Sequence, residues 1–173
     1  MANFKRLNAK NKRPGWSLAP QEEKEFAVED FKGMSDQDRD AANLILNTGG
    51  LLVKVVENYR DAIEKRLKAV LVKQGNFDPR PEREGGDKHH KLRKLAIKTG
   101  IKLKEETLLI LEKPALQQTQ SSNVSYSGTQ CVIDNDTWSR GDTNQQTQAL
   151  IVECNIYKAL CDEVWTASEH IFQ

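Results

Sequence analysis

Basic side chains are concentrated, with no acid among them, in the segment from Lys88 to Lys104. The seven are Lys88, Lys91, Arg93, Lys94, Lys98, Lys102 and Lys104. Four of these lysines, from Lys91 to Lys102, recur at spacings of three, four and four residues, which would place them on one stripe of a helix. Like charges on one stripe repel each other unless a polyanion neutralises them. The segment therefore predicts contact with the phosphate backbone of a nucleic acid.

The same segment has a second, apolar side. Leu92, Leu95, Ala96, Thr99 and Leu103 fall together on a helix, so we expect the helix to bury one face and expose the basic one. The alternative is a solvated surface helix with no ligand. Such helices usually alternate glutamate with lysine to gain pairs at i,i+4, and no acid interrupts this segment.

A second basic island lies at the N-terminus. Residues 1–14 carry a charge of +5 and residues 76–104 another +5, whereas 15–48 carry −5, 49–75 carry +3 and 105–173 carry −7. Two separated islands within a net charge of +1 favour local contacts to a polyanion. The predicted nucleic-acid-binding residues are Lys5, Arg6, Lys10, Lys12, Arg13, Lys88, Lys91, Arg93, Lys94, Lys98 and Lys102.

A more specific hypothesis concerns residues 95–101. Ala96, Gly100 and Ile101 resemble the first helix and turn of a helix-turn-helix motif. Two positions depart from that motif, because Thr99 and Glu106 stand where aliphatic residues are expected. The second helix would also carry several glutamates, which oppose binding to phosphate. A sequence-reading DNA-binding protein is therefore less favoured than a backbone-binding one.

The sequence contains none of the common catalytic or metal-binding motifs. The chain has no P-loop, dinucleotide fingerprint, HExxH site or nucleophile elbow. His89 and His90 would diverge on a helix, and the three cysteines (Cys131, Cys154 and Cys161) form no CxxC pair. We expect that the protein is not an enzyme and that it binds no metal and no cofactor. With no membrane-spanning run or signal sequence, and with reduced thiols, we expect a cytoplasmic protein.

The pattern of elements predicts a mainly α fold. We expect a helical bundle with one long central helix and a long C-terminal helix, a basic N-terminal arm at 1–16, and a single helical domain at 17–173 that contains a polar loop at 115–143. A first helix should start near Pro20 and end at Gly33. The central helix should run over 36–73, kinked but continuous through Gly49-Gly50, and a helix over 103–112 should follow the basic one.

The C-terminal helix is expected over 144–172, after a capping box formed by Thr143 and Gln146. Its apolar residues follow a four-three alternation that is typical of a core or subunit-docking helix: Leu150, Cys154, Tyr157, Cys161, Val164, Ser168 and Ile171. We therefore expect contacts to other protein subunits through this helix. Trp16, Tyr126 and Trp138 could stack on bases or dock on a partner.

These observations predict a non-catalytic nucleic-acid-contacting structural subunit of a larger nucleoprotein assembly. The general make-up is that of small helical subunits of RNA-guided effector complexes or virions, although no motif matches either. The nucleic acid is expected to be single-stranded or RNA, contacted through its backbone. The alternative is a protein–protein assembly or adaptor module without nucleic acid.

Overall fold

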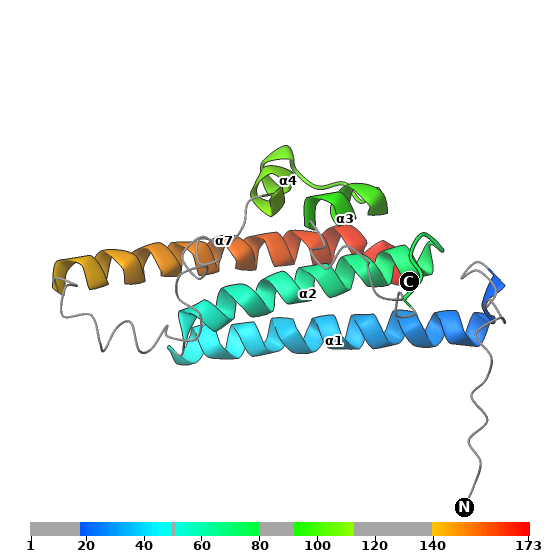
Figure 1. The fold of residues 1–173 in the computed structure, drawn as a ribbon, viewed down its shortest axis with the longest axis horizontal. Helices are drawn as coiled ribbons and strands as arrows, with labels where there is room; N and C mark the ends of the chain where they lie inside the picture. The colour runs from blue at the N-terminus through cyan, green and yellow to red at the C-terminus, as the bar shows by residue number, and fades with distance from the viewer. Residues whose placement is uncertain (1–17, 50, 80–91, 113–139) are drawn as a thin grey trace, which may run out of the picture.

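A computed structural model describes residues 18–49, 51–79, 92–112 and 140–173, and this part of the chain is mainly helical. The helices are α1 (Gln21–Thr48), α2 (Leu52–Lys73), α3 (Leu92–Thr99), α4 (Glu105–Glu112) and α7 (Arg140–Phe172). The fold class is confirmed: the protein is a helical bundle with a long helix near its N-terminus and a long helix at its C-terminus (Figure 1).

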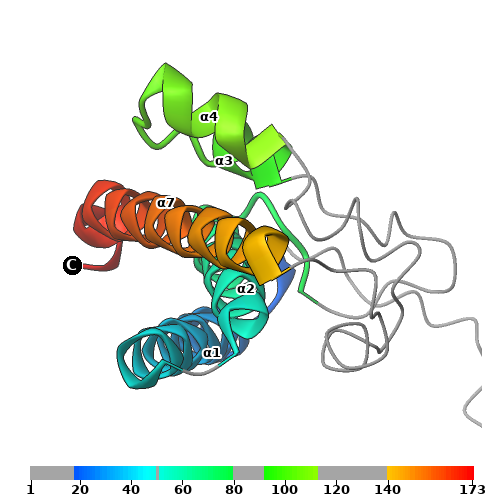
Figure 2. The ribbon, with the colours of Figure 1, turned by 90° about the vertical axis from the view of Figure 1, so that its left-hand side faces the viewer.

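The three long helices lie side by side, and α2 is the central one (Figures 1 and 2). Helices α1 and α2 form an antiparallel hairpin, whereas α7 runs in the same direction as α2 along its other side. Helices α3 and α4 lie on the far side of the bundle from α1. One core joins all five helices, and its fully buried side chains on α2 include Tyr59, Ile63 and Leu67.

The central position of α2 follows from the distribution of its apolar residues. Helical spacing predicts one buried stripe from Leu44 to Val70, and its α2 part is confirmed, because Val55, Tyr59, Ala62, Leu67 and Val70 are all buried. Its α1 part is wrong, because Leu44 and Thr48 are exposed. Towards its C-terminus the helix is buried on every side, from Ala69 to Val72. A helix that is apolar all round must be covered all round. Helices α1, α3 and α7 each contact α2 and together supply that cover.

Both predicted helix boundaries around the hairpin were wrong. Helix α1 continues through Gly33, where we expected it to end, and it stops at Thr48 before the glycine pair that we expected to be only a kink. Gly49 adopts a left-handed conformation with φ of 69°, and its N–H donates to the carbonyl oxygen of Ile45. This is the usual C-terminal stop of a helix, and glycine adopts it without a Cβ clash.

The two glycines should respond oppositely to alanine. Gly33 lies inside a helix with open space where a Cβ would project, so Gly33→Ala should raise the free energy of unfolding by about 0.5–1 kcal/mol. Gly49 has a positive φ, so Gly49→Ala should lower it by about 1–2 kcal/mol. Urea denaturation measures both. A stabilising Gly49→Ala would contradict the chain reversal at this residue.

Other boundaries differ by a few residues. Helix α7 begins at Arg140 and not at 144, so the Thr143–Gln146 pair lies within the helix and not at its start. Helix α4 begins at Glu105 and not at 103. The arm at 1–16 and the loop at 115–143 up to residue 139 lie outside the described residues. The division into an arm and one helical domain stays a prediction.

Candidate nucleic-acid interface

Helix α3 has the two faces that its sequence predicts. Leu92, Leu95, Ala96 and Thr99 are buried, and the helix contacts α2 through this side. Lys94 and Lys98 are exposed on the helix surface. The apolar residues of the segment therefore fix the helix on the bundle, and its lysines face solvent.

A turn after α3 changes the predicted stripe. Gly100 has a φ of 68°, and its N–H donates to the carbonyl oxygen of Ile97. The hydroxyl of Thr99 donates to the carbonyl oxygen of Ala96 at 2.6 Å and accepts from the N–H of Ile101 at 3.3 Å. The helix thus ends at Thr99, and the expected continuation of its lysine stripe to residue 102 is wrong. Lys102 lies in the connection to α4 instead.

A carboxylate of α7 holds this connection in place. Glu163 accepts a hydrogen bond from the backbone N–H of Lys104 at 2.7 Å, and its other oxygen accepts from the Thr107 hydroxyl at 2.7 Å. A carboxylate at a helix N-terminus satisfies free N–H groups and complements the helix dipole. Glu163 was not predicted, because it lies more than fifty residues from its partners in the sequence.

The lysines around this turn differ from the other basic residues in the described part of the chain. Lys94, Lys98, Lys102 and Lys104 are exposed, and no described residue makes a hydrogen bond, ion pair or ring contact with their side chains. We call these four the α3–α4 lysines. Every other lysine or arginine has such a partner within residues 18–49, 51–79, 92–112 and 147–173, the ranges in which the structure describes side chains. These are Lys24, Lys32, Arg39, Lys54, Arg60, Lys65, Arg66, Lys68, Lys73, Arg93 and Lys158.

Arg93, another predicted phosphate contact, forms an ion pair within the chain. Its Nη1 donates to Glu112 of α4 at 2.9 Å, so a carboxylate already neutralises its charge. The predicted contacts Lys5, Arg6, Lys10, Lys12, Arg13, Lys88 and Lys91 lie outside the described residues. Of the predicted site, the structure describes Lys94, Lys98 and Lys102 as exposed side chains of one short segment, to which it adds Lys104.

Helix α4 has the acidic surface expected from its sequence. Glu105, Glu106 and Glu112 are exposed, and Leu109 stands among them with 48% of its surface accessible. In the helix-turn-helix hypothesis α4 would be the recognition helix. Its glutamates would face phosphate, so α3 and the connection after it are the better surface for a polyanion.

The described cysteines are poor nucleophiles. Burial raises the pKa of Cys154 to about 11 and that of Cys161 to about 12, and both side chains are fully buried. The thiolate is the reactive form of cysteine, so a raised pKa keeps both groups inert. Among the residues that the structure describes, no three His, Cys, Asp or Glu side chains gather as a potential metal site.

Thiol labelling tests this placement. In a Cys131→Ser variant, the two remaining thiols should stay unlabelled by DTNB in the native protein at pH 8, and raising the pH to 9 should change little. Both pH values lie below the two raised pKa values. Labelling should become complete in denaturant. Rapid labelling of the native variant would contradict the burial of these side chains.

The predicted docking face of α7 has another role. Cys154, Tyr157, Cys161, Val164 and Ser168 are buried, and the helix contacts α2. The heptad-like face therefore belongs to the core of this chain, which is one of the two roles predicted for it, and contact of this helix with other subunits stays a prediction. A different stripe of α7 is exposed, formed by Ala149, Val152, Ile156 and Ala159.

None of the described helices is long and apolar enough to cross a membrane. No protein-family model matches the chain, and no curated protein or solved structure matches it.

Proposed function

We propose that the protein is a non-catalytic subunit that contacts the phosphate backbone of a nucleic acid through the α3–α4 lysines. The observation that carries this proposal is the contrast in pairing. Elsewhere in the described residues each basic side chain has a partner, whereas four lysines within one short segment are exposed and have none there. Their mutual repulsion is relieved when they meet a polyanion, and the counterions released from the nucleic acid favour binding.

A structural role explains only part of this cluster. Lys98 lies in the last turn of α3, where a positive charge complements the helix dipole. Lys102 and Lys104 lie beyond that helix, and Lys94 lies in its first turn, so the helix dipole explains the position of Lys98 alone. Binding of a polyanion would explain why all four lysines are exposed without a partner among the described residues.

The type of side chain favours backbone contact over base recognition. Lysine presents a compact point charge, whereas the planar fork of arginine suits paired hydrogen bonds to a base edge. Arg93 is the arginine nearest to the α3–α4 lysines in the sequence, and its guanidinium already donates a hydrogen bond to Glu112. Phosphate contacts position a protein on a nucleic acid without reading its sequence.

The remaining features of the proposal come from the sequence. They are the contribution of the arm at 1–16, a preference for RNA or single strands, membership of a larger nucleoprotein assembly such as an RNA-guided effector complex or a virion, and a cytoplasmic location. The basic arm would add phosphate contacts to those of the α3–α4 lysines.

Binding of the whole chain to fluorescent oligonucleotides tests the proposal. At low salt we expect measurable affinity for single-stranded RNA and DNA, little discrimination among sequences, and a steep loss of affinity as salt increases. No binding at low salt would contradict the proposal. Strong preference for one duplex sequence would instead favour the helix-turn-helix hypothesis.

The second candidate is an assembly or adaptor module without nucleic acid, and the exposed stripe on α7 favours it. Val152 is 56% exposed and Ile156 is 38% exposed, and alanines continue the stripe in both directions. The first turns of α7 also extend past the hairpin of α1 and α2 (Figure 1). Failure to bind any oligonucleotide at low salt would make this candidate the better one.

A further inference from the structure

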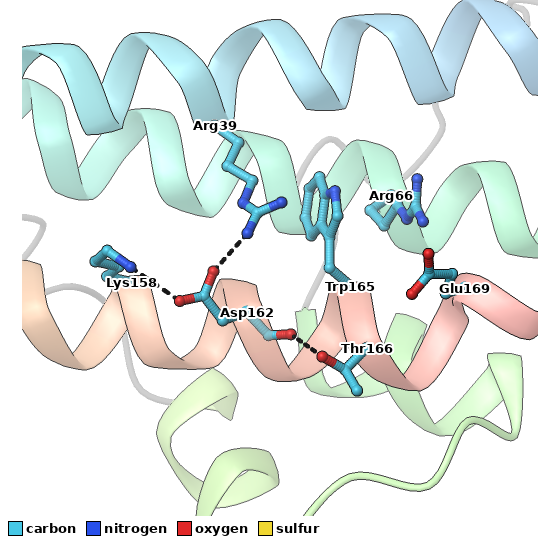
Figure 3. A pocket seen from close by; sticks show the side chains of 7 residues that line it. All are labelled: Arg39, Arg66, Lys158, Asp162, Trp165, Thr166 and Glu169. Atoms are coloured by element: carbon cyan, nitrogen blue, oxygen red, sulfur yellow. Dashed lines mark hydrogen bonds and ion pairs between the residues drawn. The ribbon is translucent and has the colours of Figure 1, made fainter.

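A cavity of about 560 Å³ lies between α1 and α7, away from the α3–α4 lysines (Figure 3). Its volume is in the range of small-molecule sites. The lining side chains come from α1, α2 and α7, and three of them are basic and two acidic. They are Arg39, Arg66, Lys158, Asp162, Trp165, Thr166 and Glu169.

Arginine side chains of the same chain cover both faces of the Trp165 ring. It lies between Arg39 and Arg66, and each guanidinium carbon is 5.0 Å from the ring centroid (Figure 3). Its indole N–H donates to Asp36 at 3.0 Å. Because the two arginines cover the ring, it offers no face on which a base or another aromatic group could stack. The cavity therefore suits a ligand that recognises the cations.

One end of the cavity shows how these cations hold an oxyanion. Asp162 accepts from Arg39 at 2.6 Å and from Lys158 at 3.0 Å, one bond to each carboxylate oxygen. Burial raises the pKa of Asp162, but the hydrogen bonds from Lys158 and Arg39 outweigh it and hold the pKa below its usual value. The side-chain carboxylate of Asp162 therefore fills this end of the cavity.

The other end holds a buried cation without such a partner. Arg66 is only 4% exposed, and its Nε donates to the neutral hydroxyl of Ser168 at 3.0 Å. No described residue forms an ion pair with it. Asp36 and Glu169 are the nearby acids, and they partly offset the effect of burial, which lowers the pKa of Arg66. A buried charge without an ion-pair partner is costly, and such groups are frequent at functional sites.

Two further cations lie around the Phe172 ring that covers Arg66, although neither they nor Phe172 line the cavity. The guanidinium carbon of Arg66 is 4.4 Å from the centroid of the Phe172 ring, and the ammonium groups of Lys73 and Lys32 are 5.7 and 5.9 Å from it. Lys32 is also 3.7 Å from Glu29, which is exposed. The negative end of the α7 dipole stabilises positive charge near the C-terminus of the helix. Arg66, Lys73 and Lys32 share this stabilisation.

We propose that Arg66 anchors a binding site for a small oxyanion, a phosphate or a carboxylate group, at the end of the cavity between α1 and α7 that Arg66 itself lines. The ligand takes the position relative to Arg66 that Asp162 takes relative to Arg39. Lys73 and Lys32 add attraction from α2 and α1. The site is independent of the α3–α4 lysines, which lie on α3 and the connection after it.

Fluorescence of Trp165 tests the site, because the indole touches Arg66. In a Trp16→Phe, Trp138→Phe background, Trp165 is the single tryptophan of the chain. Titration with inorganic phosphate, and separately with acetate, should give a saturable change that sodium chloride of equal ionic strength does not reproduce. The tighter of the two anions identifies the ligand as a phosphate or a carboxylate.

Two variants separate this site from general charge effects. Arg66→Met keeps the length and apolar contacts of the side chain, and it should weaken anion affinity at least about tenfold. Lys98→Gln on α3 removes one charge elsewhere and should leave the affinity unchanged. If circular dichroism shows that Arg66→Met is unfolded, Lys73→Gln replaces it, with a severalfold loss expected. A response no different from sodium chloride, or equal affinity in the Arg66 or Lys73 variant and the parent, would overturn the proposal.

Discussion

Replacing Leu67 with alanine is expected to lower the free energy of unfolding by about 2–5 kcal/mol. Leu67 is fully buried in α2, within the core shared by all five described helices. The shorter side chain removes apolar contacts and leaves a cavity that neighbouring helices fill only in part. Urea denaturation, monitored by circular dichroism, measures the loss.

Leu44→Ala is the matched control for this substitution. Leu44 lies on α1 with 65% of its surface exposed, so the same chemical change should alter stability by less than about 0.5 kcal/mol. Losses of similar size in the two variants would contradict the central place of α2 in the core.

Neutralising the α3–α4 lysines should have the largest effect on function. In the variant Lys94→Gln, Lys98→Gln, Lys102→Gln, Lys104→Gln, affinity for single-stranded RNA at low salt should fall roughly 10- to 100-fold, because up to four phosphate contacts are lost. Fluorescence polarisation measures the affinity. The fold should persist, since all four side chains are exposed and make no hydrogen bond, ion pair or ring contact with a described residue.

A second variant separates this cluster from net charge. Replacing Lys54, Lys65, Lys68 and Lys158 with glutamine removes the same number of charges from lysines that are paired with acids. These charges are already neutralised, so their loss should weaken RNA binding much less. Equal losses in the two variants would show that general charge governs binding and not the cluster.

The sequence was most informative where one residue pattern had one physical solution. Leu92, Leu95, Ala96 and Thr99 of α3 are buried as their spacing predicts, because an amphipathic helix has one face to bury. The apolar residues of α7 were also predicted correctly as a buried face. Their partner is α2 of the same chain, and local spacing contains no information about which surface covers a face.

The glycines show why helix boundaries were harder to predict. Gly33 and Gly49 have the same intrinsic cost in a helix, yet α1 includes the first and ends at the second. Packing of the hairpin decides between them, because a reversal at Gly49 lets α1 and α2 lie along each other over their length. Propensity alone does not contain this tertiary effect.

The candidate sites were predictable only in part. Exposure of Lys94 and Lys98 followed from the amphipathic pattern of α3, whereas Lys102 lies beyond that helix. The pairing of Arg93 with Glu112 depends on how α3 packs on α4. The cluster of Arg66 with Trp165 and Phe172 brings together residues about a hundred positions apart. Such contacts between distant helices have no signature in a single sequence.

The central claim is that the α3–α4 lysines contact phosphates, and the salt dependence of RNA binding tests it most directly. The logarithm of the binding constant should fall linearly with the logarithm of salt concentration, with a slope of about −0.7 for each phosphate neutralised on a single strand. We predict that the α3–α4 variant has a slope shallower than the parent by up to about 3, while the paired-lysine variant keeps the parental slope. Equal slopes in the parent and the α3–α4 variant would contradict the claim.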